Sequence, residues 1–138
     1  MTARYLLDTN IYIYVRRNRP SAVLERFRRL EPGEAVLSVI TYGELAYGAQ
    51  KSEQRSRAME ALARAISQTP VLPLPEDAAA AYGQIRAHLE ARGEMIGGNY
   101  LWIAAHAKAA GLILVTNNER EFRRIPGLNI QDWTVAAS

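Results

Sequence analysis

Short apolar runs alternate with segments of helical periodicity along this chain. The runs are bounded by turn-forming residues, which is the pattern of strands buried in a parallel sheet. We expect strands at about residues 4–8, 35–39, 69–74, 112–115 and 128–131. We expect helices at about residues 10–19, 22–30, 40–51, 52–67, 78–92, 101–110 and 119–123. This alternation predicts an α/β domain with a mostly parallel central sheet.

Two local patterns refine that prediction. Segment 69–74 contains prolines, which cannot donate to a neighbouring strand, so it suits the edge of the sheet. In the 52–67 helix, apolar residues recur at helical spacing and predict a buried stripe of Met59, Leu62, Ala63 and Ile66. No repeat or linker interrupts the pattern, so residues 1–138 are predicted to form a single domain.

The amino-acid composition excludes several classes of protein and of functional site. The chain of 138 residues has no cysteine, which excludes disulfides, thiolate metal sites and a cysteine nucleophile. No signal-like N-terminus and no apolar run of about 18 residues is present, so we expect no membrane segment and a cytoplasmic protein.

Arginine is concentrated near the N-terminus of a chain whose net charge is only +3. Residues 1–30 contain Arg4, Arg16, Arg17, Arg19, Arg26, Arg28 and Arg29, against two acids, Asp8 and Glu25. Arginine is well suited to bidentate phosphate contacts, so this distribution is compatible with a nucleic-acid footprint. Two solvated basic helix faces would give the same pattern.

Asp8 directly follows the first predicted strand, in Leu7-Asp8-Thr9-Asn10. It therefore falls at the carboxyl edge of the sheet, where open α/β sheets bind their ligands. A helix cap or an Asx-turn would explain the same residue without any site.

Glu44 lies in a predicted helix of apolar and small residues. None of its neighbours at spacing 3 or 4 is basic, so no local ion pair supports its charge. Burying an unpaired acid is costly unless it binds a cation or accepts hydrogen bonds. Gly43 and Gly48 each weaken the helix, so we expect something to approach its backbone closely. The alternative is a surface glutamate on the outer face.

Two further segments place polar residues at element ends. Thr116-Asn117-Asn118 follows the most strand-like run and leads to Glu121, although Glu121 could simply favour the N-terminus of its short helix. Asn99 follows two glycines at a helix start, where asparagine is also a good N-cap.

Together, these segments resemble a known family in order and spacing. The resemblance rests on Leu7-Asp8-Thr9-Asn10, the helix of Glu44, the segment 97–107, Val115-Thr116-Asn117-Asn118-x-x-Glu121-Phe122, Ile125-Pro126-Gly127-Leu128 and Asp132-Trp133. The set is similar to the PIN domain, and more closely to VapC, the toxin of VapBC toxin–antitoxin pairs. It covers essentially the whole chain and implies a three-layer α/β/α sandwich.

The resemblance implies an endoribonuclease that depends on Mg²⁺ or Mn²⁺ and is inhibited by a VapB-type antitoxin. Structured RNA such as tRNA is the implied substrate. The catalytic positions would be Asp8, Glu44, Asn99 and Glu121, with metal held at Asp8 and Asn99, and with Asn10 and Thr116 beside them. Oxygen ligands suit such hard ions. We read His106, two helical turns beyond Asn99, as structural.

Surface residues suggest the partners. Arg16, Arg17 and Arg120 could offset the negative field of the acids toward RNA. Tyr12, Tyr14, Tyr42 and Tyr47 give the early helices more aromatic surface than one small core needs, so we expect these helices to bind the antitoxin and the domain to form a homodimer.

The chain departs from the family pattern at position 99, where the pattern has aspartate. Asparagine is isosteric but neutral and offers a single carbonyl oxygen. We therefore expect weak or absent cleavage by this chain. Two alternatives to the toxin stay open: a PIN-domain nuclease of RNA processing, and a catalytically dead module that binds RNA or antitoxin.

Other strand-end aspartate enzymes fit less well. Phosphatases of the haloacid dehalogenase type need a second aspartate at position 10, which is asparagine here. Receiver domains need a lysine after a late strand, and Lys51 and Lys108 do not follow strands.

Overall fold

The computed structural model describes residues 2–135 of the chain. Within them, five strands run as β1 (Tyr5–Leu7), β2 (Ala35–Ser38), β3 (Val71–Leu72), β4 (Ile113–Val115) and β5 (Ile130–Gln131). The helices are α1 (Thr9–Arg17), α2 (Ser21–Arg28), α3 (Val39–Gln50), α4 (Arg55–Ile66), α5 (Asp77–Ala91), α6 (Gly98–Ala110) and α7 (Glu119–Phe122). No helix in this part of the chain is both long and apolar enough to cross a membrane.

The strands form one sheet in the order β3-β2-β1-β4-β5, and every pairing is parallel. The sheet confirms the predicted α/β class, and β3 with its flanking prolines lies at the edge, as expected. β1 occupies the centre, and its last residue Leu7 pairs with Val115 of β4. The carboxyl ends of β1 and β4 therefore lie side by side.

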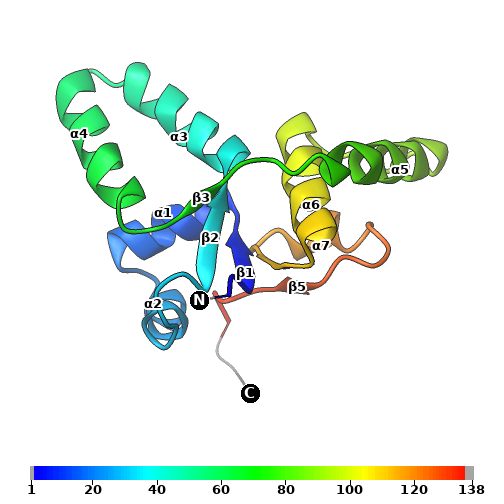
Figure 1. The fold of residues 1–138 in the computed structure, drawn as a ribbon, viewed down its shortest axis with the longest axis horizontal. Coiled ribbons are helices and arrows are strands. Elements are labelled where there is room, and N and C mark those ends of the chain that lie inside the picture. The colour runs from blue at the N-terminus through cyan, green and yellow to red at the C-terminus, as the bar shows by residue number, and fades with distance from the viewer. Residues whose placement is uncertain (1, 136–138) are drawn as a thin grey trace.

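Alternation along β1 separates two hydrophobic clusters. Leu6 faces a cluster built with α5 and α6, including Ile85, Leu89 and Ile103. Tyr5 and Leu7 face the other cluster, built mainly with α1 and α2. Figure 1 shows α5, α6 and α7 on one side of the sheet and α1 and α2 on the other, with α3 and α4 forming a projecting hairpin. These are the three layers that the resemblance implied.

The predicted buried stripe of α4 is partly wrong. Leu62 is buried and Ile66 is partly buried, but Met59 and Ala63 are exposed. The covered positions besides Leu62 and Ile66 include Ala58, Ala61 and Ala65. The helix thus packs through its small residues, which allow close approach, and its packed face is rotated from the predicted one.

Candidate active site at the carboxyl edge of the sheet

Asp8 is positioned by both elements that it joins. Its backbone N–H donates to the Val115 carbonyl at 3.0 Å, which extends the β1–β4 pairing by one residue. Its Oδ1 accepts the Ile11 N–H at 2.9 Å, so the side chain caps α1. The helix-cap interpretation of Asp8 is therefore confirmed, and it does not exclude a further role.

Asp8 is 3 % exposed. Burial, above all, raises its pKa from the ordinary value of 3.8 to about 6, and the negative charges of Glu44 and Asp132 add to the increase. Hydrogen bonds from the Thr116 side chain and the Ile11 backbone oppose it. A buried carboxylate with other acids nearby would gain stability from a cation.

Glu44 is partly buried and bonded on both oxygens. The Thr9 hydroxyl donates a short hydrogen bond to Oε1, and the Asn99 amide donates to Oε2 at 3.2 Å. These contacts tie α3 to the start of α1 and of α6. The surface interpretation of Glu44 is therefore wrong.

The two glycines beside Glu44 do not mark a close backbone approach within the described chain. A Cβ added at Gly43 or Gly48 would meet no atom within 4 Å. The expectation of a close neighbour is therefore wrong for the free chain. Gly48 instead lines a groove between α1, α3 and α4 that also contains Thr9, Glu44 and Arg16.

Asn99 and Tyr100 lie in the first turn of α6, which begins one residue earlier than Asn99. Gly97 occupies the N-cap position, so Asn99 is not the cap. Asn99 is exposed, and its side-chain amide donates a hydrogen bond to Glu44. Burial, followed by the charges of Asp8, Glu121 and Glu44, raises the pKa of the Tyr100 phenol. The phenol thus lies within the field of three of these acids.

Glu121 lies in the first turn of α7 and accepts a hydrogen bond from the Asn118 side-chain amide at 3.2 Å. Thr116 is buried, and its Oγ1 accepts the Asn118 N–H at 2.9 Å. Asn118 makes no side-chain cap bond to the helix. Thr116 therefore organises the turn that leads from the end of β4 to Glu121.

The other predicted site residues lie at the periphery. Asn10 is exposed in the first turn of α1, and Arg120 is exposed on α7. Arg16 and Arg17 are exposed near the end of α1 and line the groove that contains Glu44. Within residues 2–135, the ion pairs involve other arginines.

Sequence reasoning did not assign Tyr100 or Asp132 to the site, although Asp132-Trp133 was part of the resemblance. Asp132 follows β5 directly, which is the same strand-end signal that singled out Asp8, and its charge reaches Asp8. Tyr100 gave no such signal, because an aromatic residue near a helix start ordinarily indicates core packing.

His106 is buried beneath the site on α6. Its Nδ1 and the Ser38 Oγ lie 2.8 Å apart in a hydrogen bond, and Ser38 also caps α3 by accepting the Ile40 N–H. Burial lowers the pKa of the imidazole, which favours the neutral form. The contact joins α6 to the start of α3 and agrees with a structural role.

The donor set suits a hard divalent ion. Within the described residues, no three His, Asp or Glu side chains form a group that could hold an ion by themselves. Mg²⁺, however, commonly keeps several waters and uses only one or two carboxylates together with substrate phosphates. The Asp8 and Glu44 carboxylates fit that kind of site, and the Asn99 side chain lies next to Glu44 through the hydrogen bond from its amide.

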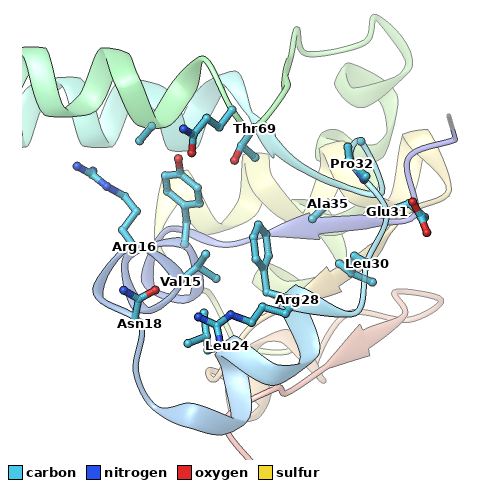
Figure 2. Close-up of a pocket in the computed structure, with 15 residues that line it drawn as sticks. Val15, Arg16, Asn18, Leu24, Arg28, Leu30, Glu31, Pro32, Ala35 and Thr69 are labelled. Atoms are coloured by element: carbon cyan, nitrogen blue, oxygen red, sulfur yellow. The ribbon is translucent and has the colours of Figure 1, made fainter.

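A second groove, of about 640 Å³, lies between α1, α2, the entry to β2 and the end of α4. Figure 2 shows Val15, Leu24 and Leu30 among its apolar lining, together with Arg16 and Arg28. Arg16 also lines the groove of Glu44. The two grooves therefore share a residue near the end of α1.

Fold and site together define a class of protein. The family model for the PIN domain matches residues 5–128. Relatives include Ribonuclease VapC2 of Haemophilus influenzae, 44% identical over 94% of this chain and 98% of that protein. The tRNA(fMet)-specific endonuclease VapC of Shigella flexneri is 43% identical over 95% of this chain and 98% of that protein. The chain belongs to the PIN-domain family and, within it, to the VapC group.

Solved structures agree with this assignment. The DNA-bound VapBC of Salmonella typhimurium superposes with a TM-score of 0.88 at 42% identity, covering 96% of this chain and 99% of that one. VapBC-1 from nontypeable Haemophilus influenzae gives 0.87 at 41% identity, covering 95% and 98%. The predicted family and PIN-like fold are confirmed.

Proposed function

We propose that this chain is a metal-dependent endoribonuclease toxin that cleaves RNA and is neutralised by a VapB-type antitoxin. The observation that carries the proposal is the buried Asp8 carboxyl at the carboxyl edge of the sheet, with Glu44 and Asp132 near enough to raise its pKa. Relatives that match nearly the full length of the chain are named ribonucleases or tRNA(fMet)-specific endonucleases. We therefore take tRNA as the first substrate to test.

Asp8, Glu44 and Asn99 would hold Mg²⁺ or Mn²⁺. When bound, such an ion stabilises charge on the attacking and leaving oxygens of a phosphodiester and lowers the pKa of bound water. Thr9 and Thr116 orient the two carboxylates through hydrogen bonds. We define the acidic cluster as Asp8, Glu44 and Glu121, the three acids whose charges act on Tyr100.

Arginines around the cluster would hold the RNA backbone. Arg16, Arg17 and Arg120 are exposed, and the first two line the groove of Glu44. Replacing each with glutamine should weaken RNA binding and flatten its salt dependence, because each phosphate contact releases counterions. Arg86→Gln, at an exposed arginine of α5 that does not line this groove, is the matched control.

Cleavage by this chain should be slow, because Asn99 is neutral. A full charge about 4 Å from another is worth about 4 kcal/mol at an effective dielectric of about 20, and solvation offsets part of that. Asn99→Asp returns a negative charge beside Glu44 and should raise the rate.

The test is cleavage of initiator and elongator tRNA with EDTA, Mg²⁺ or Mn²⁺, using this chain, Asn99→Asp and Asp8→Asn. We expect divalent-dependent cleavage that Asn99→Asp increases and Asp8→Asn abolishes. No cleavage by any form, combined with intact antitoxin binding, would favour the binding module instead. Cleavage that persists in Asp8→Asn would show that the acidic cluster is not the catalytic site.

The antitoxin would lie in the groove of Figure 2. Its apolar lining suits the apolar face of a helix, and Arg16 and Arg28 suit acidic residues beside that face. Of the four early tyrosines, Tyr12 is buried core, whereas Tyr42 and Tyr47 on α3 are exposed. The expectation of an aromatic surface is therefore wrong for Tyr12.

Pull-down with the product of a small neighbouring gene tests this partner. Leu24→Glu, in the groove, should abolish binding, whereas Met95→Glu, at an exposed apolar residue outside it, should not. Equal binding by both variants would place the antitoxin elsewhere. An absent neighbouring gene, with RNA cleavage intact, would favour the RNA-processing nuclease.

A homodimer is the second partner proposal. Val39 and Tyr42 are exposed together on α3 and offer an apolar patch. Tyr42→Glu should lower the sedimentation coefficient if this patch joins two copies. An unchanged sedimentation coefficient would show that the patch is not the dimer interface.

A further inference from the structure

We propose that Tyr100 limits how tightly the acidic cluster binds a divalent cation, and this inference rests on the proposed metal-dependent function. The side chain projects from the residue after Asn99, which is hydrogen-bonded to Glu44, and its ring packs on the residue after Glu121. It is a specific feature of how α6 begins, because the start of that helix at Gly98 brings residue 100 into the first turn.

Packing fixes the Tyr100 ring between two elements of the site. The ring lies 5.5 Å from the Phe122 ring, centre to centre, at 59°. Phe122 is fully buried on α7 and follows Glu121 directly. On its other side, the ring lies close to Gly97, since a Cβ added there would be 3.7 Å from Cδ2 of Tyr100.

The position of the ring relates it to all three carboxylates. The preceding residue, Asn99, is hydrogen-bonded to Glu44, and the ring partner Phe122 adjoins Glu121. The charges of Asp8, Glu121 and Glu44 all act on the phenol, so the ring lies within the field of these three acids. Tyr100 therefore brings a bulky side chain with an uncharged hydroxyl to the region between Glu44 and Glu121.

A neutral phenol is a poor substitute for what an ion needs there. Mg²⁺ demands near-octahedral oxygen ligands and gives up its waters reluctantly, so a site must leave space for them. A protonated hydroxyl adds no charge, and the ring takes space. Shortening the side chain should release that space, and a carboxylate at the same position should add charge as well.

Binding of Mn²⁺ alone, followed by the EPR signal of the free ion, measures this directly without RNA or activity. Tyr100→Leu keeps an apolar contact for Phe122 but shortens the side chain, and it should bind Mn²⁺ roughly tenfold more tightly. Tyr100→Phe keeps the ring and should stay within about twofold of the unaltered chain. Tyr100→Asp should bind more tightly than the leucine variant.

Tyr82→Ala is the matched control, since that tyrosine stacks on Trp102 at the α5–α6 contact and not on the cluster. Its Mn²⁺ affinity should be unchanged. Circular dichroism identifies any variant that fails to fold, and the phenylalanine and leucine forms preserve packing against Phe122.

Two results would overturn the proposal in different ways. Equal Mn²⁺ affinity in the unaltered and leucine forms, or weaker binding by Tyr100→Phe, would show that the ring does not limit the site, while leaving the metal-dependent function standing. Absence of Mn²⁺ binding in every form, aspartate included, would overturn both the limiting role and the metal-dependent nuclease.

Discussion

Replacing Asp8 with asparagine should stabilise the folded chain at neutral and alkaline pH. One pKa unit corresponds to about 1.4 kcal/mol, so a rise from 3.8 to about 6 corresponds to about 3 kcal/mol of native-state destabilisation once the carboxyl is ionised. Asparagine remains neutral, and its carbonyl oxygen can still accept the Ile11 N–H that caps α1. The gain should therefore be at most about 3 kcal/mol, because the buried amide N–H₂ also needs a hydrogen-bond partner.

The sign of the pH dependence follows from the direction of the shift. Because the folded-state pKa is raised, the folded state holds the proton more tightly than the unfolded chain does. Below pH 3.8 the carboxyl is protonated in both states, and this group carries no penalty. The penalty grows as the pH rises from 3.8 through about 6 and is complete above that.

Urea unfolding of this chain and of Asp8→Asn, at pH 4 and at pH 8 with EDTA, measures the effect. The two proteins should differ little at pH 4. At pH 8 the variant should gain up to about 3 kcal/mol in free energy of unfolding, or roughly 10 °C in Tm. Comparing the two at each pH cancels the other titrating groups.

Asp77→Asn is the matched control, because Asp77 is exposed in the first turn of α5. Its effect should be small and should lack the rise between pH 4 and pH 8. A loss of stability in Asp8→Asn at pH 8, or a gain of the same size at pH 4, would refute the reasoning. Either result would mean that burial of the carboxyl does not strain the native state.

Three further predictions concern the frame of the site. Gly48→Ala should raise the free energy of unfolding by roughly 0.5–1 kcal/mol, since its Cβ meets nothing and alanine favours helix; denaturation that shows a loss would contradict this. Ser38→Ala should cost about 2 kcal/mol, because it removes the α3 cap and the partner of buried His106; urea unfolding against Ser67→Ala tests it. Trp133→Ala should cost about 3–5 kcal/mol through loss of a fully buried ring, and a cost below 1 kcal/mol by calorimetry would be inconsistent with that burial.

The sequence was sufficient to predict the element types and the edge where polar residues gather. Asp8 and Thr116 follow apolar runs of β1 and β4, and parallel strands end on one side of a sheet, so their proximity could be expected before any coordinates. The strand order itself could not be read from periodicity, because every apolar run could pair with any other.

The start of α6 could not be fixed from local preferences. Asparagine after two glycines indicates an N-cap, yet the helix begins at Gly98 and places Tyr100 toward the acids. Burial of Ile96 and Leu101 on either side anchors this segment, and tertiary packing overrides the weak preference of a single residue. The rotated face of α4 has a similar cause, since alanines pack on several faces almost equally well.

The hydrogen bond between Ser38 and His106 constrains which substitutions these two positions can accept during evolution. Loss of Ser38 leaves the buried imidazole without this hydrogen bond, at a cost of about 1–3 kcal/mol, whereas Ser38 keeps the Ile40 N–H as a partner if His106 is lost. An apolar residue at position 106 removes the cost of the unpaired imidazole. Substitution of Ser38 should therefore be accompanied by substitution of His106, whereas His106 can change alone. An alignment of many full-length relatives should show that a change at position 38 goes with a change at position 106, although the two residues are 68 positions apart in the chain.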